Sequence, residues 1–184
     1  MKALMYFFVM AVIVLAGCAK DDTMFDNQET LELKKAKVPV PFKLDAYVVT
    51  DMESDLILIE GLDEWTPSRL FCSGTATHVG NINPEKSFYT LEKMVFFLKD
   101  DLPHSRNTGK GILVGANGDG FEYTFTVVQN LVDGTCTGIN EIIPGSGTGK
   151  FKGVKGTFNV IGGWHEDGIG LWFKNEGYSY LVFE

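Results

Sequence analysis

Three histidines and two internal cysteines are the residues of this 184-residue chain whose types most often carry metal or proton chemistry. His78, His104 and His165 lie far apart, and no two have the i, i+4 spacing by which a helix presents two imidazoles to one ion. Neither Cys72 nor Cys136 has a second cysteine or a histidine at the short spacing of a structural zinc site. The sequence therefore predicts no metal site.

The neighbours of each histidine favour a structural role. His104 follows Asp101-Leu102-Pro103, a composition typical of a solvated loop. His165 precedes Glu166-Asp167-Gly168, which a turn between two strands explains, although this group could also transfer protons or bind a cation. His78 lies on or just past a strand-like segment, where a histidine is more often a hydrogen-bonded structural residue than a catalyst.

Two glutamates could transfer protons if the fold encloses a cavity. Glu92 and Glu122 each lie in the middle of a strongly apolar stretch, and a carboxyl group on an apolar inner face has a raised pKa. Strand alternation equally allows both side chains to point to solvent. With His78, they are the candidate ionisable groups of a cavity. No Gly-x-Ser-x-Gly turn is present, and no catalytic residue is assigned.

Two glycine-rich segments evoke nucleotide sites without matching them. In Pro144–Phe151 the first glycine stands one position late for a phosphate-binding loop, and Phe151 replaces the hydroxyl residue that would hold magnesium. Gly147-Thr148-Gly149 lacks the third glycine of a dinucleotide-binding turn and a following helix. We predict no cofactor.

The N-terminus begins with Lys2 and an uncharged apolar run over residues 3–16, which is short for a membrane span and fits a secretory signal. Leu15-Ala16-Gly17-Cys18 resembles the lipobox of bacterial lipoproteins, in which the cysteine thiol takes a diacylglycerol. A plain cleavable signal with a chance cysteine is the alternative. The resemblance implies that residues 1–17 are removed and that Cys18 anchors the protein to a membrane through its acyl chains.

The residues after Cys18 suggest where this anchor lies. Ala19-Lys20-Asp21-Asp22 resembles the short signal that sends lipoproteins of Bacteroidetes-type bacteria to the outer face of the outer membrane. Asp22-Thr23-Met24 resembles the O-glycosylation motif of those bacteria, which makes Thr23 a candidate acceptor. The resemblance implies a surface-exposed, extracytoplasmic protein anchored to the outer membrane.

Such a compartment permits disulfides and leaves two interpretations of Cys72 and Cys136 open. Both cysteines fall in strand-like segments, where a free thiol behaves as a small buried apolar group. A disulfide between them requires Cα atoms within about 7 Å, which the spacing alone does not establish.

Composition divides the rest of the chain into a tether and one domain. Residues 18–37 are polar and charged, as in a flexible tether with a reach of about 25 Å. Residues 38–184 have the length of a single domain. The formal net charge of −8 disfavours nucleic acid as a partner, because acidic surfaces repel phosphate backbones.

A two-residue alternation recurs through residues 38–184 and predicts strands. In Phe121–Val128, apolar residues alternate with Glu122, Thr124 and Thr126. Asn117-Gly118-Asp119-Gly120 before this run is a strong hairpin signal. Similar strands are expected over residues 42–48, 88–98, 157–164 and 169–173, with turns at 133–134, 144–147 and 166–168.

Many short strands joined by tight turns predict an all-β sandwich or barrel. The glycines of Gly147–Gly156 suggest sharply bent strands and favour a single antiparallel barrel of about eight or more strands, with a β-sandwich as the alternative. We expect the aromatic residues near the C-terminus to fill the core rather than line a pocket. They are Trp164, Trp172, Phe173, Tyr178 and Tyr180.

Three segments within Arg69 to Gly163 resemble, in their order, bacterial barrel proteins related to the allene oxide cyclase and dirigent-type fold. They are Ser73–Gly80, Ala116–Asp119 and Gly147–Gly156. Allene oxide cyclases close a ring in a fatty-acid epoxide and dirigent proteins orient coupling radicals, both inside an apolar barrel cavity. None of their functional side chains matches a position here, so the resemblance implies a fold rather than an activity.

Three functions follow as hypotheses. The first is a non-catalytic, membrane-tethered barrel that binds a small apolar or aromatic molecule or presents its rim loops to a surface protein partner. The second is a cofactor-free isomerase or cyclase acting on an apolar substrate in the cavity, and the third is a structural or adhesive surface protein. A cavity of hundreds of Å³ favours a ligand, and an ionisable group inside it favours an enzyme.

Overall fold

The computed structural model describes residues 39–175 and 179–183. The predicted signal peptide and the whole predicted tether, with Cys18 and Thr23, lie outside the described residues. One short 3₁₀ helix, η1 (Gly149–Phe151), accompanies the strands. The strands are β1 (Val40–Pro41), β2 (Leu44–Thr50), β3 (Leu56–Glu60), β4 (Glu64–Pro67), β5 (Arg69–Ala76), β6 (Gly80–Asn81), β7 (Phe88–Lys99), β8 (Leu102–Val114), β9 (Gly120–Asn130), β10 (Cys136–Ile142), β11 (Lys155–Trp164), β12 (Leu171–Lys174) and β13 (Tyr180–Val182).

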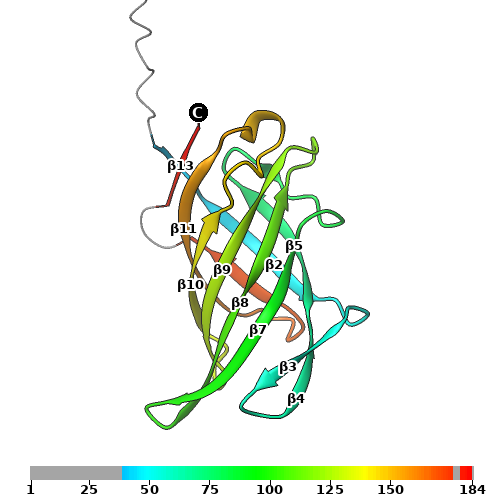
Figure 1. Cartoon of the computed structure of the whole chain (residues 1–184), viewed down its shortest axis with the longest axis vertical. Helices are drawn as coiled ribbons and strands as arrows, with labels where there is room; N and C mark the ends of the chain where they lie inside the picture. Colours follow the sequence, from blue (N-terminus) through cyan, green and yellow to red (C-terminus); the bar gives the residue numbers. More distant parts are fainter. Residues whose placement is uncertain (1–38, 176–178, 184) are drawn as a thin grey trace, which may run out of the picture. The chain divides into compact units, whose positions relative to one another are not determined.

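Eight of these strands close into an antiparallel barrel in the order β2-β5-β7-β8-β9-β10-β11-β12, with β12 returning to β2 (Figure 1). At the seam, β11 pairs with β12 along Ile161–Trp164 and with β13 along Lys155–Thr157, and β13 pairs with β1. The predicted barrel is therefore confirmed and the β-sandwich alternative is wrong. Because these pairings all lie within residues 40–182, the barrel is complete without the N-terminal segment.

The β3–β4 hairpin leaves this ring and lies beside the long β7–β8 hairpin at the lower end of Figure 1. The upper part of β7, Phe88–Thr90, pairs with β5, whereas Met94 and Val95 pair in parallel with β3. A register shift between Leu91 and Lys93 separates the two parts. The hairpin thus takes the place of β5 in the lower part of the wall.

The local sequence explains the strands well. In β9, Phe121, Tyr123, Phe125 and Val127 are buried, and the polar residues between them are exposed, as the alternation predicts. The β8–β9 turn forms where the hairpin signal predicts it, with the Gly115 amide donating to the Asp119 carbonyl at 2.8 Å. Strands are also present at the four other predicted positions, where they are β2, β7, β11 and β12.

The upper end of the barrel is plugged by the β10–β11 connection, residues 143–154. Phe151 at the end of η1 is 0% exposed, and its ring packs against Phe121 at 5.3 Å between centroids. A Cβ on Gly147 would lie 1.9 Å from the Phe151 carbonyl oxygen, so this close approach requires glycine. The expectation of bent strands is wrong for Gly147, Gly149 and Gly153, which belong to this plug, while Gly156 lies in β11.

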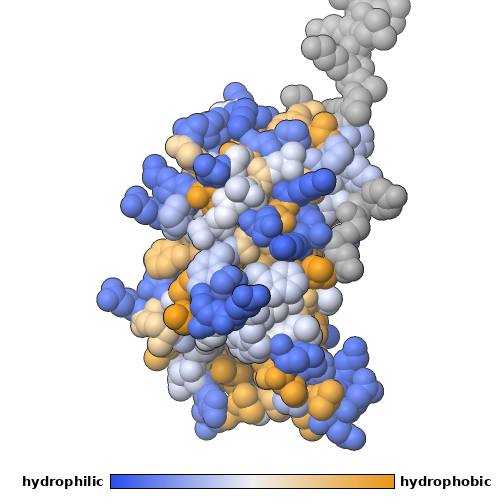
Figure 2. All heavy atoms as spheres, turned by 180° about the vertical axis from the view of Figure 1, so that it is seen from behind, coloured by the Kyte–Doolittle hydropathy of each residue, from blue (hydrophilic) through white to orange (hydrophobic). Residues whose placement is uncertain are grey.

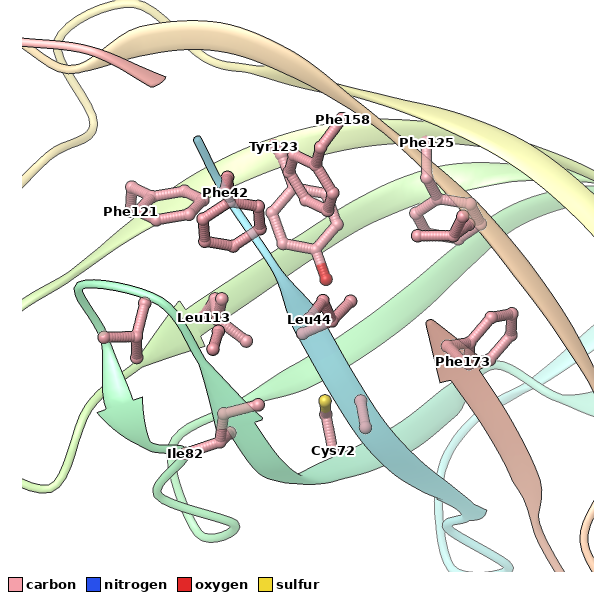
Figure 3. Packing of buried hydrophobic residues seen from close by; sticks show 14 of the residues in the cluster. Phe42, Leu44, Cys72, Ile82, Leu113, Phe121, Tyr123, Phe125, Phe158 and Phe173 are labelled. Carbon is pink, nitrogen blue, oxygen red and sulfur yellow. The ribbon is translucent and has the colours of Figure 1, made fainter. Parts of the chain in front are cut away.

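Aromatic side chains fill the barrel interior beneath the plug. Figure 3 shows Phe42, Phe121, Tyr123 and Phe158 gathered together, with Phe125 and Phe173 farther along the barrel. The Phe42 and Phe158 rings meet at 5.0 Å, and Tyr123 and Phe158 at 5.3 Å. Such edge-on pairs add to the stability that burial alone provides.

The C-terminal aromatic residues depart from their predicted place. Phe173 is buried, as expected, and Trp172 is half-buried. The expectation is wrong for Trp164 and Tyr180, which are 51% and 37% exposed. Trp164 ends β11 at the open end of the barrel, where its ring lies against Gly134 and is partly exposed. Tyr178 lies outside the described residues.

Candidate ligand cavity

The lower half of the barrel holds a cavity of about 200 Å³. All eight barrel strands and β4 contribute side chains to it. Its apolar wall consists of Val48, Leu70, Tyr89, Leu91, Met94, Phe125, Val127, Trp164, Leu171 and Phe173. Its polar wall consists of Thr50, Thr66, Asn107, Gln129 and Cys136.

Three rings form the inner boundary of this cavity, on the side of the plug. Tyr89 lies 5.5 Å from Phe125 and 5.9 Å from Phe173 between ring centroids. Gly109 lies opposite Phe125, and a Cβ there would lie 2.0 Å from the Thr90 carbonyl oxygen and 3.0 Å from the tip of the Phe125 ring. Below the rings the inward positions carry smaller side chains such as Val127 and Cys136, so the barrel is not filled.

A row of uncharged polar side chains faces inward on β8 and β9. Ser105 and Asn107 lie on β8, and Gln129 lies opposite Ser105 in the β8–β9 register. Ser105 is fully buried and Gln129 is 8% exposed. Within the described part of the chain, Ser105 Oγ and Asn107 Oδ1 are buried without a hydrogen-bond partner. An unpaired buried polar group destabilises the fold by about 1–3 kcal/mol, so it points to a role other than stability.

The ionisable groups inside the barrel are neutral at physiological pH. Burial raises the pKa of the Cys72 and Cys136 thiols to about 12. Burial likewise raises the pKa of the Tyr89 and Tyr123 phenols. Both thiols are free and buried in the structure, so the first of the two interpretations of these cysteines describes them.

The candidate cavity groups named from the sequence lie elsewhere. Glu92 is exposed at the register shift of β7, where its Oε1 lies 3.4 Å from Lys110 Nζ. Glu122 is exposed because strand alternation turns its neighbours inward, and His78 lies in an exposed turn with φ of 68°. None of the three lines the cavity. Their placement inside is therefore corrected, and for the glutamates the solvent-facing alternative holds.

The other two histidines also lie away from the cavity lining. The loop prediction for His104 is wrong, since it belongs to β8 and packs against Phe97 at 5.7 Å between rings. The turn between β7 and β8 consists of Asp100 and Asp101 alone, so β8 begins at Leu102 and includes Pro103 and His104. His165 lies in the predicted β11–β12 turn, with Nδ1 3.1 Å from Asp167 Oδ2.

Asp167 is the centre of that outer turn. The Tyr47 hydroxyl donates to its carboxylate, and so do the backbone amides of Ile169 and Gly170. The Tyr47 hydrogen bond is the largest cause of the lowered pKa of Asp167, and the backbone hydrogen bonds add to it. This arrangement holds the turn against the outer wall of β2 and does not reach the cavity.

Exposed apolar side chains surround the lower end of the barrel, and we call them the apolar rim. They come from the β3–β4 and β7–β8 hairpins and from the turns at the same end of the barrel. The rim consists of Met52, Leu56, Leu58, Leu62, Trp65, Leu98, Leu102, Val132, Trp164 and Ile169. Figure 2 shows apolar surface interleaved with hydrophilic surface there. Trp164 belongs both to the rim and to the cavity lining, so the cavity opens toward this end.

Asn107 and Gln129 are the site residues that sequence reasoning missed. Gln129 is the next inward-facing residue of β9 after Phe121, Tyr123, Phe125 and Val127. Strand alternation alone could therefore have predicted its position. Asn107 carries no such signal, because its stretch of β8 is rich in polar residues and glycine.

Comparisons with protein-family models, with curated proteins and with solved structures each find no match. Within residues 39–175 and 179–183, no helix is long and apolar enough to cross a membrane. The same residues contain no cluster of three or more histidine, cysteine or carboxylate side chains that could hold a metal ion.

Proposed function

We propose that this protein is a membrane-tethered binding protein whose barrel takes up a small apolar or aromatic molecule and does not transform it. The cavity of about 200 Å³ below the aromatic rings carries this proposal. Its lining is mainly apolar with a few polar groups, which is the usual composition of small-molecule sites. For scale, an engineered apolar cavity of about 150 Å³ in another protein binds benzene, so a molecule of one or two rings is the appropriate size.

The lining favours binding over an isomerase or cyclase. Among the described residues that line the cavity, none is a carboxylate, histidine, lysine or arginine. The ionisable groups that do line it, Tyr89 and Cys136, have raised pKa values and remain protonated. The sequence candidates Glu92, Glu122 and His78 lie on the outside. A proton-transfer mechanism therefore has no evident base in this cavity.

The cavity also favours a ligand over a purely structural or adhesive role. A structural barrel gains stability by filling its interior, as the plugged half does around Phe121 and Phe151. The resemblance to allene oxide cyclase and dirigent-type barrels supports the same proposal, because those proteins also use an apolar interior. Of their activities, nothing is transferred to this chain.

The proposed anchor lies on the N-terminal side of the first described strand. The described chain enters the barrel through β1, which pairs with β13 beside the plugged end (Figure 1). A lipid on Cys18 followed by the tether would hold the barrel at the membrane. We propose that Lys20-Asp21-Asp22 places the barrel outside the cell, where it meets its ligand.

Naphthalene binding to the chain Ala19–Glu184 tests the binding proposal. This chain retains every described residue and lacks the lipid, and we expect saturable binding of one naphthalene per chain. Val127→Phe should abolish binding by filling the cavity, whereas Thr126→Phe on the outer face of the same strand should leave it unchanged. Equal binding by both variants would place naphthalene on the apolar rim and favour a protein partner there.

Fatty-acid labelling of cells tests the anchor separately. The unaltered protein should incorporate label, and Cys18→Ala should lose it and leave the membrane fraction. Protease added to intact cells should remove the barrel, and replacement of Lys20, Asp21 and Asp22 by alanine should protect it. A label retained by Cys18→Ala would refute lipidation, and protection of the unaltered protein would place it on the periplasmic face.

A further inference from the structure

We infer that the ligand of this cavity is electrically neutral and carries a hydroxyl or carboxamide group, which the Asn107 side chain recognises while an apolar ring or chain lies against Tyr89, Phe125 and Phe173. This inference rests on the proposed binding function and narrows it to a class of ligand.

Four described residues have a buried side-chain polar atom without a hydrogen-bond partner, and of these only Asn107 lines the cavity; the others are Ser105, Asn140 and Asn175. Asn107 lies between Met94 of β7 and Val127 of β9, so apolar side chains flank it on both sides. Its Oδ1 is buried and has no hydrogen-bond partner within the described residues. A leucine has nearly the same size and would avoid the cost of burying an amide there. The amide is therefore better explained by a hydrogen bond to a guest than by packing.

The position of Gln129 along the barrel gives the ligand a direction. The β8–β9 register pairs Asn107 with Val127 and Ser105 with Gln129, one step nearer the open end. On the other side of Asn107, toward the plug, lie Phe125 and Tyr89. A guest entering from the apolar rim thus meets polar side chains first and rings last. Its apolar part lies deep and its polar group remains at the level of Asn107 and Gln129.

Ligands that carry a charged acid or amine group should bind poorly in this cavity. The cavity-lining residues named above include no cationic side chain to pair with a carboxylate or phosphate and no carboxylate to pair with an ammonium. An ion buried without a partner loses its hydration without compensation. The turns around the opening also carry Asp100, Asp101, Asp133 and Glu166, which repel anions as they approach.

Three probes of similar size test this inference on the chain Ala19–Glu184: naphthalene, 2-naphthol and 2-naphthoate. We expect 2-naphthol to bind about tenfold tighter than naphthalene, which is the effect of one net hydrogen bond. The anion 2-naphthoate should bind at least about a hundredfold more weakly than 2-naphthol, because its charge finds no partner.

The variant Asn107→Leu should lose the preference for 2-naphthol over naphthalene and should retain the cavity. Its affinity for 2-naphthol should fall about tenfold, to the level of naphthalene, while its affinity for naphthalene stays the same or rises. Asn159→Leu, the same change on the exposed face of β11, should behave like the unaltered chain. Circular dichroism and thermal melting of each variant establish that it is folded. If Asn107→Leu does not fold, Gln129→Met serves in its place and should also weaken 2-naphthol selectively.

The outcomes separate the two proposals. Naphthalene and 2-naphthol binding equally, 2-naphthoate binding tightest, or a 2-naphthol preference that survives Asn107→Leu would each overturn the ligand class and leave the binding function standing. Binding of none of the three probes would overturn both.

Discussion

The two ends of the barrel are built from the same eight strands and differ in what fills them. At the plugged end, Phe151 from the β10–β11 connection packs on Phe121, and the interior is closed by rings. At the open end, the wall changes partner at the register shift of β7, and the β3–β4 hairpin brings Thr66 to a cavity. The plugged end is the packed part of the interior, and the open end holds the cavity in which we propose that the ligand binds.

Truncation of the plug residue Phe151 should have the largest effect on the free energy of unfolding. Phe151→Ala leaves a void in the packed half and should lower the free energy of unfolding by about 3–5 kcal/mol. Naphthalene affinity of the molecules that remain folded should be unchanged, because the three inner rings separate Phe151 from the cavity. Urea unfolding and probe titration measure the two quantities. A lost affinity together with retained stability would invert the roles of the two ends.

The second largest effect is expected for the alkylation rates of the Cys72 and Cys136 thiols, because only Cys136 lines the cavity. With pKa values raised to about 12 by burial, both cysteines bind protons more tightly than an exposed thiol, so the thiolate fraction remains small until the pH approaches 12. At pH 8 this should slow alkylation about a thousandfold relative to an ordinary thiol with a pKa of about 8.5. Cys136 lines the cavity and Cys72 does not, so bound 2-naphthol should slow labelling of Cys136 alone. Iodoacetamide labelling followed by peptide mass spectrometry checks both expectations, and equal protection of the two cysteines would contradict them.

Replacing a valine by the larger phenylalanine should destabilise the plugged end more than the open end, by a smaller difference than the changes above. Val154→Phe in the plugged half should cost about 1–3 kcal/mol, because overpacking forces neighbours out of place. Val127→Phe in the open half enters existing space and should change stability by less than about 1 kcal/mol. Thermal melting of the two variants gives the comparison, and equal losses would indicate that the cavity is not open to a side chain.

The outer turn at Asp167 should show the smallest effect. Since its folded-state pKa is lowered, the stabilisation from this carboxylate is present above its ordinary unfolded pKa of about 3.9 and is lost as pH falls through the lower folded value. Tyr47→Phe removes the largest cause, so the pKa of Asp167 should rise toward its ordinary value while the backbone amides still hold it below. NMR titration of the Asp167 carboxyl group measures this shift. An unchanged pKa would mean that the backbone amides alone hold the charge.

The strands, the β8–β9 turn and the inward face of β9 could be predicted from the amino-acid sequence. These features are local, since two-residue alternation and the glycines of Asn117–Gly120 act within one hairpin. Lipidation at Cys18, surface export and glycosylation at Thr23 also come from sequence alone, and they stay predictions because those residues lie outside the described chain.

Which part of the barrel is filled and which part is hollow depends on how segments distant in the sequence pack together. Phe151 plugs the barrel because residues 143–154 fold back over its end. A glycine-rich sequence is compatible both with such a connection and with a sharply bent strand. The register shift beside Glu92 moves later residues of β7 to other faces, which strict alternation does not anticipate. Asn107 becomes a candidate site residue only when β7 and β9 surround it, because its unpaired oxygen is a property of the closed barrel and not of β8.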